Sequence, residues 1–419
     1  MSKQLFERLA VAPLDQRVTS LDACAYFYRF ATCLGWIPPV EKGWLRWTYA
    51  LWTITTMLMG VVYLPLGLSL TYVVHFDRFT PMEFLTSLQV DLNCVGNVIK
   101  TCVTYSQMWR MRRMNELIAP LDDRCRTPSQ REILHKVVAR VNRVIIFFMC
   151  TYFSFSILTL FTSIAVGKAP WQLYNPFVDW MIGTWQLWVA SIVEFFMVWT
   201  GESQELLADT FPIVFISLFR AHLAILKDRI ENLRKDEELS EEEHYEELVA
   251  CIQDHRTIIE CSNIIRPMLS YTIFAQFMLV GIVLGLAGFN ILFFPNTIWT
   301  ILSNIAFIMA ICTETFPCCL LCEFLIEDCS KLSDAVFHSN WLTATKRYKS
   351  AVIYFLHRTQ QVIEFKAGSI FPISVQSNIA VAKFAFTIIT IVNQMNLGEK
   401  FKRNREMPGD LDRVLMEDN

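Results

Sequence analysis

Five polar residues interrupt the apolar segment 371–395 at a spacing that places them on one side of a helix. They are separated by 7, 4, 3 and 4 residues, and at about 100° per residue they fall within roughly 40° of one line. Polar groups are costly in hydrocarbon, so this stripe must face protein or water. It could hydrogen-bond to other helices or form the wall of an aqueous pathway. The five residues are Gln376, Lys383, Thr387, Thr390 and Gln394.

The composition of the chain is typical of a membrane protein. Apolar residues make up 53% of it and charged residues only 18%, against roughly a quarter in a soluble domain. The net charge of −3 gives no case for nucleic-acid binding. No continuous apolar core follows the first residues, so we expect no cleavable signal peptide and a cytosolic N-terminus.

No group of residues in the sequence has the spacing of a catalytic or metal site. The histidines are scattered, and neither a Gly-rich phosphate loop nor a Gly-x-Ser-x-Gly motif is present. Cys318, Cys319 and Cys322 lie in mostly apolar surroundings, which favours packing thiols over metal ligands. All 13 cysteines fall in expected spans or cytosolic loops, so we expect most to be reduced. The sequence thus predicts no enzyme, no metal and no cofactor.

Seven segments are long and apolar enough to cross a bilayer, which takes about 20 residues each. We therefore expect an all-α membrane protein with seven transmembrane helices. The expected spans are 47–70, 84–105, 144–166, 180–201, 268–293, 297–322 and 371–395.

The distribution of Lys and Arg predicts how these spans are oriented. Residues 1–46 hold six basic residues, and the second, fourth and sixth connections hold nine, seven and six. The other three connections hold one, one and none. The positive-inside rule therefore places the N-terminus in the cytosol. The tail 396–419 conflicts with this topology. It holds five basic residues, which the same rule would place inside, but the seventh span puts it outside. This topology excludes a G-protein-coupled receptor, whose N-terminus lies outside.

The cytosolic connections have helical patterns of their own. Residues 221–235 carry an amphipathic spacing, and Ser240 with Glu243 forms a capping box for a helix from about Glu241 to Ile265. We therefore expect cytosolic anchor helices that extend spans four to seven and pack together. The expected divisions are a cytosolic segment 1–46, spans one to six in 47–322, anchor helices in 323–370, a pore-lining span 371–395 and an extracellular tail 396–419.

The last third of the chain holds a series of short elements that occur together in one known family. They are Asn340-Trp341, Arg347-Tyr348-Lys349, Tyr354-Phe355-Leu356, Gln360-Gln361, Lys366-Ala367-Gly368, Phe371-Pro372-Ile373-Ser374 and Lys383. Through these elements the chain resembles the insect odorant receptors. The second Gly of that family's Ala-Gly-Gly element is Ser369 here. Span seven also resembles the wider chemoreceptor signature through Thr387 and Gln394, with Ile388 and Met395 in place of its aromatic residues.

This resemblance implies an odorant-gated, poorly selective cation channel in the plasma membrane of an olfactory neuron dendrite or cilium. It implies a tetramer formed with a common coreceptor, and small volatile organic ligands. The coreceptor has a long insertion between spans four and five, and the corresponding loop here is short, so this chain looks like the odorant-tuning subunit. A gustatory-type chemoreceptor channel and a secondary transporter are the alternatives, although no internal repeat of the transporter kind is visible.

Particular residues follow from the resemblance and from depth in the membrane. The resemblance implies an extracellular gate at Ile391, Gln394 and Met395, beside Thr387 and Thr390 of the stripe. Lys383 should pair with a buried acid, Glu314 or Asp91, because an unpaired charge in the bilayer is costly. Glu202, Glu205 and Asp209 share a helix face and should form salt bridges with the anchor helices or attract cations. The odorant site should be small, apolar and enclosed, with Val90, Cys94, Phe153, Phe155, Trp185, Trp188, Phe277, Ile282 and Asn304 as candidates.

Overall fold

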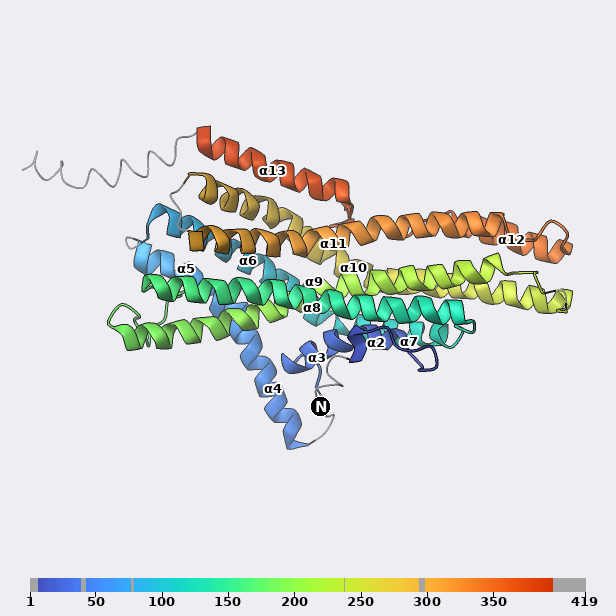
Figure 1. The fold of residues 1–419 in the computed structure, drawn as a ribbon, viewed down its shortest axis with the longest axis horizontal. Helices are drawn as coiled ribbons and strands as arrows, with labels where there is room; N and C mark the ends of the chain where they lie inside the picture. Colours follow the sequence, from blue (N-terminus) through green and yellow to red (C-terminus); the bar gives the residue numbers. More distant parts are fainter. Residues whose placement is uncertain (1–6, 39–42, 77–78, 237, 294–297, 395–419) are drawn as a thin grey trace, which may run out of the picture.

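The protein is a bundle of long helices that lie side by side along its longest axis (Figure 1). The structure is a computed structural model, and it describes residues 7–38, 43–76, 79–236, 238–293 and 298–394. The N-terminal helices are η1 (Glu7–Leu9), α2 (Ser20–Ala23), α3 (Ala25–Cys33), α4 (Trp44–Met57), the π-helical η2 (Leu58–Tyr63) and α5 (Leu64–His75). The remaining elements are α6 (Pro81–Ser106), α7 (Met108–Asp122), α8 (Pro128–Val166), α9 (Thr184–Glu231), α10 (Glu241–Phe293), α11 (Ile298–Phe337), α12 (Lys346–Thr359), β1 (Lys366–Ala367), β2 (Phe371–Pro372) and α13 (Val375–Gln394).

The long helices begin where the sequence supplies capping residues. Thr80 caps α6, with Pro81 at the first helical position, and Glu83 bonds back to the Thr80 amide at 2.9 Å. The predicted capping box of α10 is confirmed: the Ser240 amide donates to Glu243 at 2.8 Å, and the Glu243 amide donates to Ser240 Oγ at 3.3 Å. These bonds satisfy amide groups that have no partner within the helix itself.

Five helical stretches of the described chain are long and apolar enough to span a membrane, and α13 is a shorter apolar helix. They are Trp44–His75, Pro128–Val166, Thr184–Glu231, Glu241–Leu292 and Ile301–Phe337. The expected second span, α6, is not among them, because Asp91, Lys100 and several amide side chains lower its hydropathy.

The N-terminal parts of α8 and α10 and the C-terminal parts of α9 and α11 pack with α2, α3, α7 and α12 (Figure 1). We call this part of the molecule the anchor bundle. Its core holds fully buried aromatic side chains from three different helices, such as Phe27, Phe215 and Phe355. The predicted packing of the connecting helices is confirmed. One difference is that α8 also extends beyond its expected span, from residue 144 back to Pro128, because the apolar residues Leu134, Val138 and Val141 are buried in the same core.

The segment before α13 is a hairpin rather than the start of the helix. Strands β1 and β2 pair antiparallel, with Lys366 opposite Pro372, so the last helix begins at Val375 and not at residue 371 as predicted. Gly368 and Ser369 in the turn have φ of 58° and 62°, in the left-handed region that favours glycine. A Cβ on Gly368 would also clash with the Phe274 ring of α10, so the space around this position favours glycine as well. The tail 396–419 lies outside the described residues.

Helix α13 packs on α10 through two glycines one heptad apart. A Cβ added to Gly281 would meet the Phe384 ring at 2.7 Å, and one added to Gly288 would meet Ile389 Cδ1 at 2.7 Å. The absence of side chains at these positions lets α13 lie close against α10. The two helices are neighbours in Figure 1, where α13 is the red helix at the edge of the bundle.

Candidate functional site

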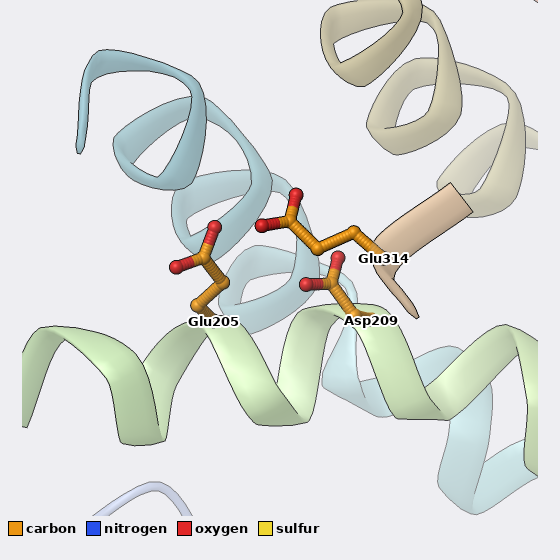
Figure 2. Close-up of side chains that lie close together, drawn as sticks. All are labelled: Glu205, Asp209 and Glu314. Carbon is orange, nitrogen blue, oxygen red and sulfur yellow. The ribbon is translucent and has the colours of Figure 1, made fainter. Parts of the chain in front are cut away.

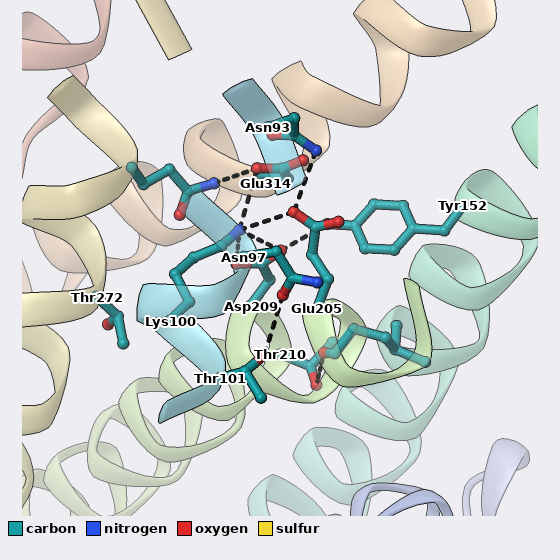
Figure 3. Close-up of polar contacts among 12 residues, drawn as sticks. Asn93, Asn97, Lys100, Thr101, Tyr152, Glu205, Asp209, Thr210, Thr272 and Glu314 are labelled. Atoms are coloured by element: carbon teal, nitrogen blue, oxygen red, sulfur yellow. Dashed lines mark hydrogen bonds and ion pairs between the residues drawn. The ribbon is translucent and has the colours of Figure 1, made fainter. Parts of the chain in front are cut away.

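A buried lysine joins four of the expected membrane helices. The Lys100 ammonium group on α6 lies 3.1 Å from Glu205 Oε1 and 3.0 Å from Asp209 Oδ1, both on α9. It also lies 3.3 Å from Glu314 Oε2 on α11 (Figure 3). The side chain of Gln276 on α10 donates to the same Glu314 oxygen at 2.7 Å. We call Lys100, Glu205, Asp209, Glu314 and Gln276 the charged cluster.

The three carboxylates of the charged cluster converge on one point. Figure 2 shows them pointing toward one another, and their nearest oxygens all lie within 4.8 Å. Such a group could hold a metal ion, but the Lys100 ammonium contacts all three carboxylates and so takes that position. Tyr152 Oη on α8 donates to Asp209 at 2.9 Å, and Asn93 Nδ2 donates to Glu205 at 3.3 Å. Side chains from α6, α8, α9, α10 and α11 therefore meet in one network of ion pairs and hydrogen bonds.

A partly open cavity of about 60 Å³ lies directly beside the charged cluster. Its wall includes apolar side chains of α5, α6, α8, α9 and α11, and carboxyl groups at one side. A volume of this size holds a few water molecules or a small organic molecule. The apolar and aromatic wall residues include Leu68, Val90, Cys94, Phe155, Trp171 and Phe307, and the acidic ones are Glu202, Glu205 and Glu314.

The loop between α8 and α9 closes one side of the cavity through Trp171. Glu194, buried on α9, accepts the backbone amides of Trp171 at 2.9 Å and Leu173 at 3.0 Å. Thr71 of α5 donates to the Gln172 carbonyl at 2.9 Å. These bonds fix the loop to two helices, and Glu194 therefore acts as a positioning residue for the cavity wall.

The structure brings three of the nine predicted odorant residues together at this cavity, namely Val90, Cys94 and Phe155. The Asn304 side chain is buried and accepts from Gln89 at 3.4 Å, and Phe277 is buried in the large core. Trp185 and Trp188 are exposed on the outside of the single chain, at 75% and 46%. Phe153 packs against Trp199, with ring centroids 5.6 Å apart, and Ile282 is half-buried. These six residues are not part of the cavity wall.

The expected pair between Lys383 and Glu314 is wrong. Glu314 lies in the charged cluster with Lys100, and Lys383 on α13 is exposed in the single chain. Asp91 is buried, and it accepts from Ser69 at 3.4 Å rather than from a lysine. The pairing of Lys383 with Glu314 was predicted from their depth in the membrane alone. In the structure, α13 packs on α10 through the side of the helix that carries Phe384 and Ile389, and Lys383 is exposed. The salt bridges expected between Glu205 or Asp209 and the anchor helices are likewise replaced by the α6 lysine.

The polar stripe of α13 lies on the surface of the single chain. Gln376, Lys383, Thr387, Thr390 and Gln394 are all exposed. The hydroxyl groups of Thr387 and Thr390 each donate to a carbonyl one turn back, at 3.0 Å. Of the predicted gate residues, Ile391 is 50% exposed and Gln394 is exposed. Met395 lies outside the described residues.

Sequence reasoning missed Lys100, the centre of the charged cluster. The signal was present, because Asn93, Asn97 and Lys100 are spaced i, i+4 and i+7 and so share one face of the expected second span. Asn97 Nδ2 donates to the Gly201 carbonyl at 3.0 Å, which ties this face of α6 to α9. Trp171 gave no comparable signal, because a loop's fold cannot be read from periodicity. Glu194 is an acid within the expected fourth span, but its loop partners could not be predicted from its position.

A second buried polar group lies in the anchor bundle, where Ser20, Asp122 and His222 meet. Ser20 Oγ lies 2.9 Å from His222 Nε2 and donates to Asp122 at 2.7 Å. The acid contacts the serine and the same ring nitrogen, so the three groups do not form a relay of the catalytic kind. Burial lowers the pKa of His222 to about 4 and raises the pKa of Asp122. The group holds α2 against α7 and α9.

Comparisons with known proteins agree on one family. The family model described as 7tm Odorant receptor matches residues 80–386. The Drosophila melanogaster protein named "Putative odorant receptor 59c" is 72% identical, and the match covers 97% of this chain and 98% of that protein. "Odorant receptor 42b" from the same organism is 45% identical, with 95% of this chain and 99% of that protein covered.

A solved structure supports the same fold. The insect olfactory receptor OR5 from Machilis hrabei matches with a TM-score of 0.73 at 14% identity, covering 90% of this chain and all of that one. The same receptor in complex with eugenol matches with a TM-score of 0.70 at 13% identity. The predicted all-helical membrane fold is confirmed, and the chain is a receptor rather than an enzyme. It belongs to the 7tm odorant receptor family.

Proposed function

We propose that this chain is the odorant-binding subunit of a ligand-gated cation channel, formed with a common coreceptor in the membrane of olfactory sensory neurons. The observation that carries the proposal is the exposed polar stripe of α13, which faces away from the α10 contact and is left for water or for other subunits. Such a surface is costly against lipid, so it fits the wall of a shared pore. At its outer end, Ile391 would close the pore by dewetting, together with Met395, and Gln394 would contact the passing ion.

The cavity beside the charged cluster is the proposed odorant site. Its apolar wall, with a few polar groups at one side, suits a small volatile molecule. The similar Machilis receptor was solved with eugenol, which is a ligand of that kind. We place Val90, Cys94 and Phe155 in this site, and Trp171 as the part of its wall that the loop supplies.

The geometry offers a route from the cavity to α13. Glu314 belongs both to the cavity wall and to the charged cluster, and Gln276 of α10 donates to it. Further along the same helix, 5 and 12 residues beyond Gln276, Gly281 and Gly288 pack against α13. A ligand that binds more tightly to one arrangement of these helices shifts the population toward it. Opening then requires that the odorant prefer the arrangement in which the last helices of the four subunits stand apart.

Co-expression with the coreceptor tests the proposal. A panel of volatile odorants should evoke cation current only when both subunits are present, and Gln394→Ala should change the relative permeability of the current. Surface labelling of the chain serves as the control for expression. The absence of current from a labelled, co-expressed receptor across a broad panel would contradict the proposed function.

A further inference from the structure

The cavity wall carries more acid than the chain neutralises. Glu202, Glu205 and Glu314 belong to the wall, and Asp209 lies directly behind them in the charged cluster. The Lys100 ammonium group contacts three of these four carboxyl groups, and Glu202 is the one without an ion pair in the described part of the chain. Among the described residues, one ammonium group therefore faces four carboxyl groups in a buried environment, where any carboxylate that is ionised and unpaired is costly.

Glu202 is also incompletely hydrogen-bonded. It is 9% exposed, and its Oε1 accepts from Ser156 Oγ at 2.5 Å. Its Oε2 has no hydrogen-bond partner among the described residues. Buried polar atoms are nearly always satisfied, so an unpartnered carboxylate oxygen on a residue of the cavity wall calls for a donor that the chain does not supply.

The rest of the cavity wall indicates the shape and polarity of the molecule that could carry this donor. Phe155, Phe307 and Trp171 give aromatic faces, and Leu64, Leu68 and Val198 give an aliphatic surface. An ester or a ketone has acceptors only and cannot bond to a carboxylate oxygen. An alkylammonium ion has three donors and a positive charge, and its chain suits the apolar side of the cavity. Aromatic rings add to the binding of such a cation.

We propose that the cavity takes a small primary alkylammonium ion, with its ammonium group between Glu202 and Glu205 and its alkyl chain against Phe155 and Phe307. This deepens the proposed odorant function, since it names the chemical class of the ligand, and it rests on the same cavity. The ion supplies both the missing donor for Glu202 and a second positive charge for the acidic side of the cavity.

Butylammonium, 1-butanol and pentane form a matched series of similar length, with a charged donor, a neutral donor and no donor. In cells that express the chain with the coreceptor, butylammonium should act at a concentration at least roughly tenfold below that of 1-butanol, because hydrogen bonds to charged groups are the stronger ones. In the Glu202→Gln variant this advantage should fall to about threefold or less. Asp91→Asn, which changes a buried carboxyl group outside the cavity wall, should leave it unchanged.

A binding measurement on the purified full chain separates this inference from the proposed function. Butylammonium should raise the thermal unfolding midpoint of the chain, and Glu202→Gln should abolish that rise. A rise without any odorant current on co-expression would support the amine site and contradict the channel role. Neutral odorants that gate current, while butylammonium neither activates nor competes nor shifts the midpoint, would overturn the amine site and leave the channel role intact. An undiminished butylammonium response in Glu202→Gln would also overturn it.

Discussion

Two lysines occupy apolar helices of this receptor, and the chain treats them in opposite ways. Lys100 on α6 has a side chain that is 2% exposed and contacts three carboxylates from two other helices. Lys383 on α13 is exposed and forms no ion pair with any described residue. The first lysine is satisfied as soon as the chain folds. The second is satisfied only by something outside the chain, either water or a neighbouring subunit.

The comparison distinguishes polar residues that stabilise the folded chain from polar residues that contact water or another subunit. A buried charge that loses its counter-charge is strongly destabilising, so the charged cluster couples α6, α9, α10 and α11 into one unit. A polar stripe on one face of a peripheral helix contributes little to that unit. In the proposed channel, it is the surface on which assembly and conduction depend.

Removing the central cation should have the largest effect. Lys100→Met leaves Glu205, Asp209 and Glu314 buried together without a counter-charge, at a cost of about 3–5 kcal/mol. We expect the variant to be retained inside the cell, with little receptor labelled at the surface. Lys136→Met is the matched control, because that lysine makes an exposed pair with Glu132 within α8. Normal surface labelling of Lys100→Met would show that the charged cluster does not hold the fold.

The buried histidine of the anchor bundle should make stability depend on pH. Because burial lowers the pKa of His222 to about 4 from an ordinary 6.5, the folded state favours the neutral ring. Its contribution is complete above pH 6.5 and is lost as the pH falls toward 4, by up to about 3 kcal/mol. Asp122 opposes this change, because its raised pKa lets the folded state take up a proton more readily as the pH falls.

Thermal unfolding midpoints of the purified receptor at pH 7 and pH 5 measure this effect. The midpoint should fall between the two values in the natural chain and fall less in His222→Gln, whose amide can still bond to Ser20. An equal fall in both chains would assign the pH dependence to other groups.

The exposed lysine should affect current and not folding. Lys383→Met removes a charge that has no partner within the described chain, so surface labelling should stay within experimental error of the natural receptor. On co-expression with the coreceptor, cation current should rise or its permeability ratios should change, because a positive charge beside a cation pathway repels the ion. A loss of surface receptor as severe as that of Lys100→Met would erase the distinction between the two lysines.

The sequence predicted the helices better than it predicted their contacts. Hydrophobic length and capping residues place α9 to α11 well, because both are local properties, as at Ser240 and Glu243. The polar face of α13 was predicted from spacing and is exposed in the structure. Spacing could not tell which lysine meets Glu314, because that depends on how α6, α9 and α11 turn toward one another. It also could not place Trp171, whose position depends on the loop bonds to Glu194.

The smallest expected effect is a difference in water access between the two faces of α13, measured by thiol labelling. Thr387 and Thr390 lie on the exposed stripe, whereas Ala385 is only 5% exposed, so Thr387→Cys and Thr390→Cys are compared with Ala385→Cys. A charged thiol reagent should change the odorant-evoked current of the first two variants and leave the third unchanged. Because 13 cysteines are already present, each effect is measured relative to the natural chain treated in the same way. Equal modification at all three positions would show that α13 leaves α10 in the assembled channel. If Thr387→Cys and Thr390→Cys are protected from the reagent both with and without odorant, then protein covers the stripe and it lines no pore.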